Sequence, residues 1–130
     1  MIELSEAQVK NACEEYLGYA WNQGKLWYCR LNAGDIFIPN KDGSRRSFKG
    51  AGAGTADLIV IQPGQVHLEY MEKQQGPGIP VAFTTFVECK SSKGKQSPEQ
   101  IEFQAKVEKL HCRYAIVRSV EDLEEVLKRE

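Results

Sequence analysis

Apolar residues near the start of the chain recur at the spacing of one helix face. Residues 5–8 (SEAQ) match a capping box, in which the serine caps the helix and the glutamine side chain reaches back. Behind them the apolar positions are Val9, Ala12, Cys13, Tyr16, Leu17 and Ala20. This pattern predicts a first helix of about four turns. Glu6 falls within the apolar stripe, so its carboxylate needs a partner, a metal or a water-filled cleft, unless the helix end frays and Glu6 is solvated.

Short apolar runs separated by turn residues follow, a pattern typical of strands. Residues 26–31 (LWYCRL) predict a strand, and residues 32–34 (NAG) predict a turn after it. Residues 35–49 predict a hairpin, because Asp42-Gly43 is a favoured two-residue turn between two short strand-like runs.

The glycine-rich segment 50–54 (GAGAG) precedes a second group of strands. A phosphate-binding loop would lead into a helix, whereas a buried strand follows here at 58–61, so we reject that interpretation. We expect Pro63-Gly64 to stop this strand. Residues 65–80 predict a hairpin with a long tip, and residues 81–89 predict the strand that follows it.

The last third of the chain predicts a helix, a strand and a closing helix. Residues 97–100 (SPEQ) repeat the capping signal with proline at the first helical position, and Phe103, Val107 and Leu110 define the apolar face behind it. A short strand is expected at 114–117. The closing helix runs from about Glu121, and its inward positions are Val120, Leu123, Val126 and Leu127. This order predicts one α/β domain over residues 1–130, with a mixed central β-sheet flanked by helices.

Composition places the chain among soluble globular proteins. It has 130 residues, of which 42% are hydrophobic and 27% charged, enough for one domain. We find neither an apolar run long enough to span a bilayer nor a signal sequence. The four cysteines are far apart without a C-x-x-C pair, and only two histidines accompany them. These counts argue against a zinc site or a disulfide framework and favour free thiols in a reducing cytoplasm.

The net charge of −1 conceals an uneven distribution of charge. Basic residues gather in two segments, and the acids gather at the C-terminus. The basic residues are Lys41, Arg45, Arg46 and Lys49, against the single acid Asp42, and then Lys90, Lys93 and Lys95. Each cluster either serves solubility or leaves a positive face on a nearly neutral molecule.

Three charged residues occupy the ends of two expected neighbouring strands. Asp57 begins one strand, and Glu88 and Lys90 end the next on one common face. If the strands are antiparallel neighbours, these residues meet at one sheet edge. Two carboxylates suit a hard cation such as Mg²⁺, with the backbone carbonyl of Cys89 as a further ligand. Such an ion activates a water for attack on a phosphate, and Lys90 would orient that water or neutralise developing charge.

Each residue of this set also has a purely structural interpretation. Asp57 is equally suited to a turn that starts a strand. Glu88 and Lys90 are equally suited to a charge pair worth under about 1 kcal/mol. Gln100 is equally suited to completing the capping box of its own helix.

The order Asp, then Glu-x-Lys, then a helix glutamine resembles the PD-(D/E)XK nuclease superfamily, with its restriction-endonuclease-like core. More narrowly, the chain resembles the VRR-NUC family of virus-type replication-repair nucleases. The likeness rests on segments 54–60 (GTADLIV), 86–104 (FVECKSSKGKQSPEQIEFQ), 114–127 (YAIVRSVEDLEEVL), 5–17 (SEAQVKNACEEYL) and 30–34 (RLNAG). Two departures are Ala56, where the family usually has proline, and the segment 65–82, which is longer than the family's compact hairpin.

This resemblance implies a role for each matching residue. Asp57 and Glu88 would be the ligands of Mg²⁺ or Mn²⁺, Lys90 the catalytic lysine, Gln100 the helix glutamine and Glu6 the first-helix acid of the active site. The basic residues that would hold DNA phosphates are Lys41, Arg45, Arg46, Lys49, Lys93 and Lys95.

The resemblance further implies a DNA-repair endonuclease that cuts branched DNA such as Holliday junctions. It would act as a homodimer in the cytoplasm of a bacterium or a phage-infected cell. The alternatives are a nuclease for flaps, ends or plain duplex, a non-catalytic nucleic-acid-binding module that kept the fold, and an interaction subunit without a nucleic-acid role. The sequence leaves open the role of segment 65–82.

Overall fold

The computed structural model describes residues 3–31, 36–48, 52–68 and 78–128. Within these ranges, no helix has the length and hydropathy needed to cross a membrane. The elements in chain order are α1 (Glu6–Asn22), β1 (Trp27–Arg30), β2 (Ile36–Pro39), β3 (Arg45–Phe48), β4 (Leu58–Val66), β5 (Ile79–Cys89), α2 (Pro98–Lys109), β6 (Arg113–Val117) and α3 (Val120–Lys128).

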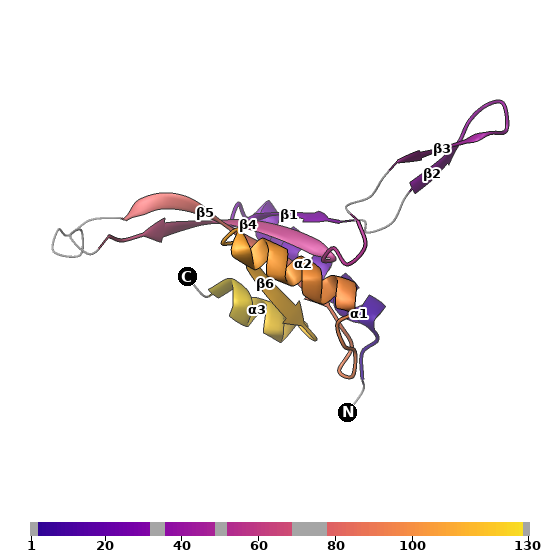
Figure 1. Cartoon of the computed structure of the whole chain (residues 1–130). Helices are drawn as coiled ribbons and strands as arrows, with labels where there is room; N and C mark the ends of the chain where they lie inside the picture. Colours follow the sequence, from indigo (N-terminus) through magenta and orange to yellow (C-terminus); the bar gives the residue numbers. More distant parts are fainter. Residues whose placement is uncertain (1–2, 32–35, 49–51, 69–77, 129–130) are drawn as a thin grey trace.

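Four of the strands form one mixed sheet, as the sequence predicts (Figure 1). Its order is β1-β4-β5-β6. The β1–β4 and β4–β5 pairs are antiparallel, whereas β5 and β6 are parallel and joined through α2. A parallel pair requires such a crossover connection, which explains why a helix separates these two strands in the sequence. The α/β class and the mixed sheet are therefore confirmed.

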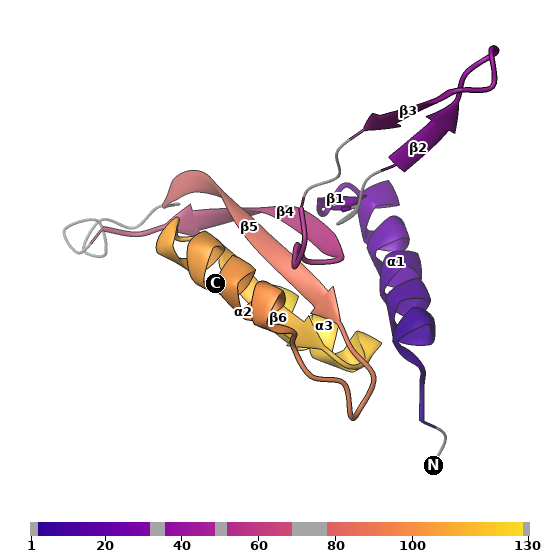
Figure 2. The same ribbon diagram turned by 45° about the vertical axis from the view of Figure 1, so that its right-hand side comes forward.

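Helices cover both faces of this sheet (Figure 2). On one face, α1 and α3 pack on alternate strand residues, so that Leu17 and Leu123 share a fully buried core with Leu58, Val87 and Val117. On the other face, α2 places Phe103 against Phe86, with ring centroids 5.2 Å apart in an edge-to-face arrangement. Alternation of side chains along each strand supplies both faces with apolar residues.

Both predicted capping boxes are present, and they set where α1 and α2 begin. Ser5 and Gln8 bond reciprocally at the start of α1, and Ser97 and Gln100 do the same at the start of α2. In α2 the apolar face is shorter than predicted. Val107 is buried, but Leu110 is 73% exposed, because it caps the helix end and lies beyond the last turn that contacts the sheet.

The strand β4 is longer than the sequence predicts. It continues through Pro63 and Gly64 to Val66, so the prediction of a stop at Pro63 is wrong. β1 pairs with β4 only as far as Ile61, and a proline, which lacks an N–H, is tolerated in a strand that is paired on one edge alone. Gly64 lies against Phe83, where an added Cβ would approach the ring to 1.9 Å. β5 is correspondingly longer than expected and begins at Ile79.

The predicted hairpin of β2 and β3 is present, but its turn differs. Asn40 N–H donates to the carbonyl of Ser44 at 2.7 Å, and Gly43 N–H donates to the carbonyl of Asn40 at 3.2 Å. The loop therefore has three residues, 41–43, with Gly43 at a φ of +88°. The prediction of a two-residue turn is wrong, because Asp42 accepts hydrogen bonds from Ser44 and the left-handed glycine closes a longer loop. The predicted turn at 32–34 and the hairpin tip at 69–77 lie outside the described residues.

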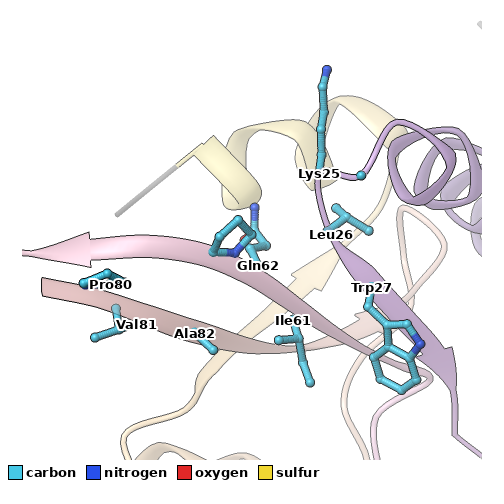
Figure 3. A pocket seen from close by; sticks show the side chains of 10 residues that line it. Lys25, Leu26, Trp27, Ile61, Gln62, Pro80, Val81 and Ala82 are labelled. Atoms are coloured by element: carbon cyan, nitrogen blue, oxygen red, sulfur yellow. The ribbon is translucent and has the colours of Figure 1, made fainter. Parts of the chain in front are cut away.

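A shallow apolar groove lies where β1 begins beside the longer β4 and β5 (Figure 3). Leu26, Trp27, Ile61 and Val81 are among the residues that line it, and its volume is about 480 Å³. The groove lies at the opposite end of β1 and its partner segment of β4 from Asp57, so it is separate from the site described next.

Candidate active site

The register of the sheet brings Asp57 and Glu88 together. Leu58 pairs with Val87, which sets Asp57 beside the last residues of β5. The backbone N–H of Cys89 donates to Asp57 Oδ2 at 2.8 Å, holding that side chain across the strand ends. The two carboxylates also interact, because the charge of Asp57 contributes to the raised pKa of Glu88. The predicted convergence at one sheet edge is confirmed, and the catalytic role of the residues stays a prediction.

The carboxylate of Glu88 is almost completely buried, with 3% of the residue exposed. Its Oε1 accepts a hydrogen bond from Gln100 Nε2 at 2.9 Å, whereas Oε2 has no hydrogen-bond partner within the part of the chain that is described. Burial and, after it, the charge of the neighbouring Asp57 together raise the pKa of Glu88 to about 7, against the opposing effect of Lys90. A buried carboxylate oxygen without a partner is a position at which a cation or a water compensates the lost hydration.

The side chain of Lys90 lies beside both glutamates that sequence reasoning associated with it. Lys90 is 8% exposed, and its backbone N–H donates to the carbonyl of Val117 at 3.0 Å, which anchors it at the end of the sheet. Its Nζ lies 3.6 Å from Glu88 Oε1 and 3.4 Å from Glu6 Oε1. The side chain of Glu6 therefore has Lys90 as a partner, and because it is 56% exposed it is also solvated.

Gln100 combines the two functions that the sequence left open. Its Oε1 accepts from the backbone N–H of Ser97 at 2.9 Å and completes the cap of α2. Its Nε2 donates to Glu88 at the same time. The cap therefore fixes the amide in the orientation that holds Glu88, and the purely structural interpretation of Gln100 is incomplete.

Lys10 belongs to this site and was missed by sequence reasoning. Its Nζ lies 3.5 Å from Asp57 Oδ1, and both side chains are about a quarter exposed. Lys10 is four residues after Glu6, so the two lie on one face of α1. The spacing of four residues between Glu6 and Lys10 was the available signal in the sequence. A single lysine on a helix surface is common, however, so this spacing indicates a site only once the contacts of the helix are known.

The carboxylate pair fits a hard divalent cation that retains several waters. Mg²⁺ is commonly held by one or two carboxylates together with substrate phosphate oxygens, and Asp57 and Glu88 provide that number. Among the described residues, no group of three or more His, Cys, Asp and Glu side chains is arranged to hold a metal ion. The orphaned Glu88 Oε2 supports the pair as ligands. The role of the Cys89 carbonyl stays a prediction.

Both helices that contribute to this edge begin there. Glu6 opens α1, and Gln100 lies in the first turn of α2. Helix N-termini carry partial positive charge, which favours the carboxylates and would also favour an anionic phosphate.

The described members of the predicted phosphate-binding set lie in two segments of the chain and are exposed. Lys93 and Lys95 are exposed in the segment between β5 and α2. Arg118 Nη1 donates to the carbonyls of Ser91 and Gly94, which holds this segment in place. Lys41, Arg45 and Arg46 are exposed on the β2–β3 hairpin, and Lys49 lies outside the described residues.

No protein-family model, curated protein or solved structure matches this chain. The assignment of function therefore rests on the chemistry of the site and on the sequence pattern alone.

Proposed function

We propose that this protein is a divalent-metal-dependent DNA endonuclease with a PD-(D/E)XK core of the VRR-NUC type. It hydrolyses phosphodiester bonds of branched DNA as a homodimer, with Mg²⁺ or Mn²⁺ as cofactor. The observation that carries the proposal is the buried Glu88 carboxylate, which has an oxygen without a partner beside Asp57 and a buried lysine.

Each residue has a defined task in this proposal. A bound ion would polarise a phosphoryl oxygen and lower the pKa of a water. Asp57 and Glu88 hold the ion, and Gln100 orients Glu88 through its hydrogen bond. Lys90 is buried, so its charge is weakly screened by solvent and suited to stabilising charge that develops on the phosphate. Glu6 keeps the Lys90 ammonium at the site edge.

Loss of one carboxylate tests the assignment. Glu88→Ala and Asp57→Ala should abolish cleavage of a labelled four-way junction in Mg²⁺, and Lys90→Ala should lose cleavage while retaining junction binding in a gel shift. Removing one group that stabilises the transition state typically costs about 10²–10³-fold in rate. Glu102→Ala, at an exposed carboxylate on α2, is the matched control and should cut normally. Wild-type turnover by Glu88→Ala would contradict the assignment.

A panel of DNA structures and metal ions tests the substrate class and the cofactor separately from the roles of the catalytic residues. Four-way junction, flap, duplex and single strand should be incubated with Mg²⁺, Mn²⁺ or chelator. Preferential symmetric cutting of the junction supports the proposal, whereas preference for flaps, ends or plain duplex would reassign the substrate.

A non-catalytic nucleic-acid-binding module is the main alternative from another class. Two adjacent carboxylates next to DNA phosphates would weaken binding in such a module, since like charges repel. Calorimetric titration with Mn²⁺ distinguishes the two, because only the nuclease requires metal binding that disappears in Asp57→Ala.

A further inference from the structure

The β2–β3 hairpin lies in the sequence between the end of β1 and the start of β4, the two strand ends beside the candidate site. β1 leads into it after Arg30, which pairs with Leu58 at the start of β4. The backbone N–H of Leu31 donates to the carbonyl of Asp57 at 2.8 Å, so the described chain before the hairpin is bonded directly to the candidate ligand. The hairpin is thus separated by four residues along the chain, 32–35, from a residue bonded to the candidate site.

The hairpin forms a sheet of its own, apart from the four-stranded sheet. Figures 1 and 2 both show it extending away from the β4–β5 ribbon. Isolated two-stranded hairpins are marginally stable in water, and this one has an ordered loop in which Asn40, Asp42 and Ser44 bond to one another. An ordered, projecting ribbon suits a binding role better than a core-building one.

The exposed groups of the hairpin include basic and aromatic side chains, the residue types suited to contacts with nucleic acid. Its described residues, 36–48, include Lys41, Arg45 and Arg46 against one acid, Asp42. Phe37 is 62% exposed. Phe37 pairs with Ser47 and Pro39 pairs with Arg45, so Phe37 and Arg45 lie on the same face of the ribbon. The major groove of duplex DNA admits a two-stranded β-ribbon, and exposed basic residues pair with its phosphates.

We propose that the hairpin is a duplex-binding arm that contacts DNA at a distance from the scissile phosphate. This inference rests on the proposed nuclease function. The ten residue-to-residue steps from Leu31 to Lys41 span at most about 33 Å when extended, which corresponds to about 10 base pairs along the duplex axis. The arm therefore favours substrates whose duplex extends well beyond the cleavage site.

The experiment compares binding to two junctions that differ only in arm length, about 5 and about 20 base pairs. Affinity is measured by fluorescence anisotropy in chelator, so that cleavage does not interfere. Lys41→Glu/Arg45→Glu should weaken binding to the long-arm junction about tenfold or more and leave short-arm binding unchanged, because the lost contacts are remote from the branch. Phe37→Ala should weaken long-arm binding in the same selective way without any change of charge.

The matched control is Lys25→Glu/Lys109→Glu, which makes the same change of charge before β1 and at the C-terminal end of α2. This control should reduce affinity for both arm lengths only slightly and equally. Thermal melts of all variants should coincide with wild type, since no hairpin residue whose side chain is described belongs to the main core.

The proposed role of the hairpin would be overturned if its variants lost affinity equally for the short-arm and long-arm junctions. It would also be overturned if both variants kept wild-type affinity. Failure of the nuclease proposal has a different signature. If wild-type protein binds junctions with the expected dependence on arm length but never cuts them, the DNA-binding role of the hairpin stands and the nuclease proposal fails. If wild-type protein binds no DNA, both proposals fail.

Discussion

At the end of β5, a carboxylate with almost no access to solvent lies between an aspartate and a lysine. Burying such a group is costly unless its oxygens are compensated, and only one oxygen of Glu88 has a hydrogen-bond donor. The remaining oxygen is the strongest local reason to expect a cation at this edge. At the scale of single residues, the site is therefore specified by Glu88 more than by any other side chain.

The pKa of Glu88 predicts how stability depends on pH in the absence of metal. The folded protein raises this pKa from 4.5 to about 7, so it binds the proton more tightly than the unfolded chain does. The resulting stabilisation is fully present below about pH 4.5 and is lost as the pH rises through about 7. Urea denaturation in chelator should show this loss in wild type, and Glu88→Gln should lack it. Parallel pH profiles for the two proteins would contradict the prediction.

Lys10 predicts a change in metal affinity rather than in fold. Its ammonium lies against Asp57, so removing it in Lys10→Ala should strengthen Mn²⁺ binding severalfold, because one cation no longer opposes another. This pair, with both side chains about a quarter exposed, should contribute under about 1 kcal/mol to stability. Calorimetric titration measures the affinity. Lys106→Ala, which removes the exposed pair with Glu102, is the control and should bind Mn²⁺ as wild type does; the same affinity in Lys10→Ala would refute the role.

At the scale of elements, the start of α2 positions the site through its cap. Ser97 holds Gln100, and Gln100 holds Glu88, so any shift of the first turn moves the hydrogen bond to the carboxylate. Gly54, the last residue of the glycine-rich segment, lies directly against this turn. Gly54 has a φ of +82°, and a Cβ there would meet the carbonyl oxygen of Glu99 at 2.3 Å. Gly54 is therefore required by close packing against α2, which agrees with our rejection of a phosphate loop.

Gly54→Ala should therefore be destabilising by about 1–3 kcal/mol, from backbone strain and the clash with α2. It should also reduce Mn²⁺ affinity, because Gln100 shifts with the helix. Gly18→Ala is the matched control, since nothing lies within 4 Å of its added Cβ in α1. That control should stabilise the protein by about 0.5–1 kcal/mol. Chemical denaturation distinguishes the two, and equal effects would refute the packing role of Gly54.

At the scale of the whole molecule, the site is assembled from segments remote in the chain. Lys10 and Glu6 come from α1, Asp57 from the start of β4, and Glu88 with Lys90 from the end of β5. The central strands join these parts, and the hairpin extends outward from the same edge. One chain offers one such site, whereas a symmetric junction presents two equivalent scissile phosphates, which favours a two-fold dimer.

The proposed homodimer predicts twice the chain mass of 14.7 kDa in light scattering. Mixed dimers of wild-type and Glu88→Gln chains should nick one strand of a junction, while wild-type dimers cut both strands. A purely monomeric mass would refute the dimer. Paired cuts that decline only in direct proportion to the concentration of wild-type chains, when Glu88→Gln chains are mixed in, would refute it as well.

The sequence by itself determined the local features of this protein. Both capping boxes, the alternating strands and the order of elements were predictable, because caps and side-chain alternation depend on residues a few positions apart. The convergence of Asp57 with Glu88 followed from the assumption that their strands are antiparallel neighbours.

Tertiary structure alone decided which partners these residues meet. The continuation of β4 past Pro63 depends on where β1 begins, and the contact of Lys10 with Asp57 depends on how α1 crosses the sheet edge. Burial of Glu88, and hence its raised pKa, arises from α2 and β6 packing around it. Such properties depend on distances through space between segments far apart in the chain, which residue spacing does not encode.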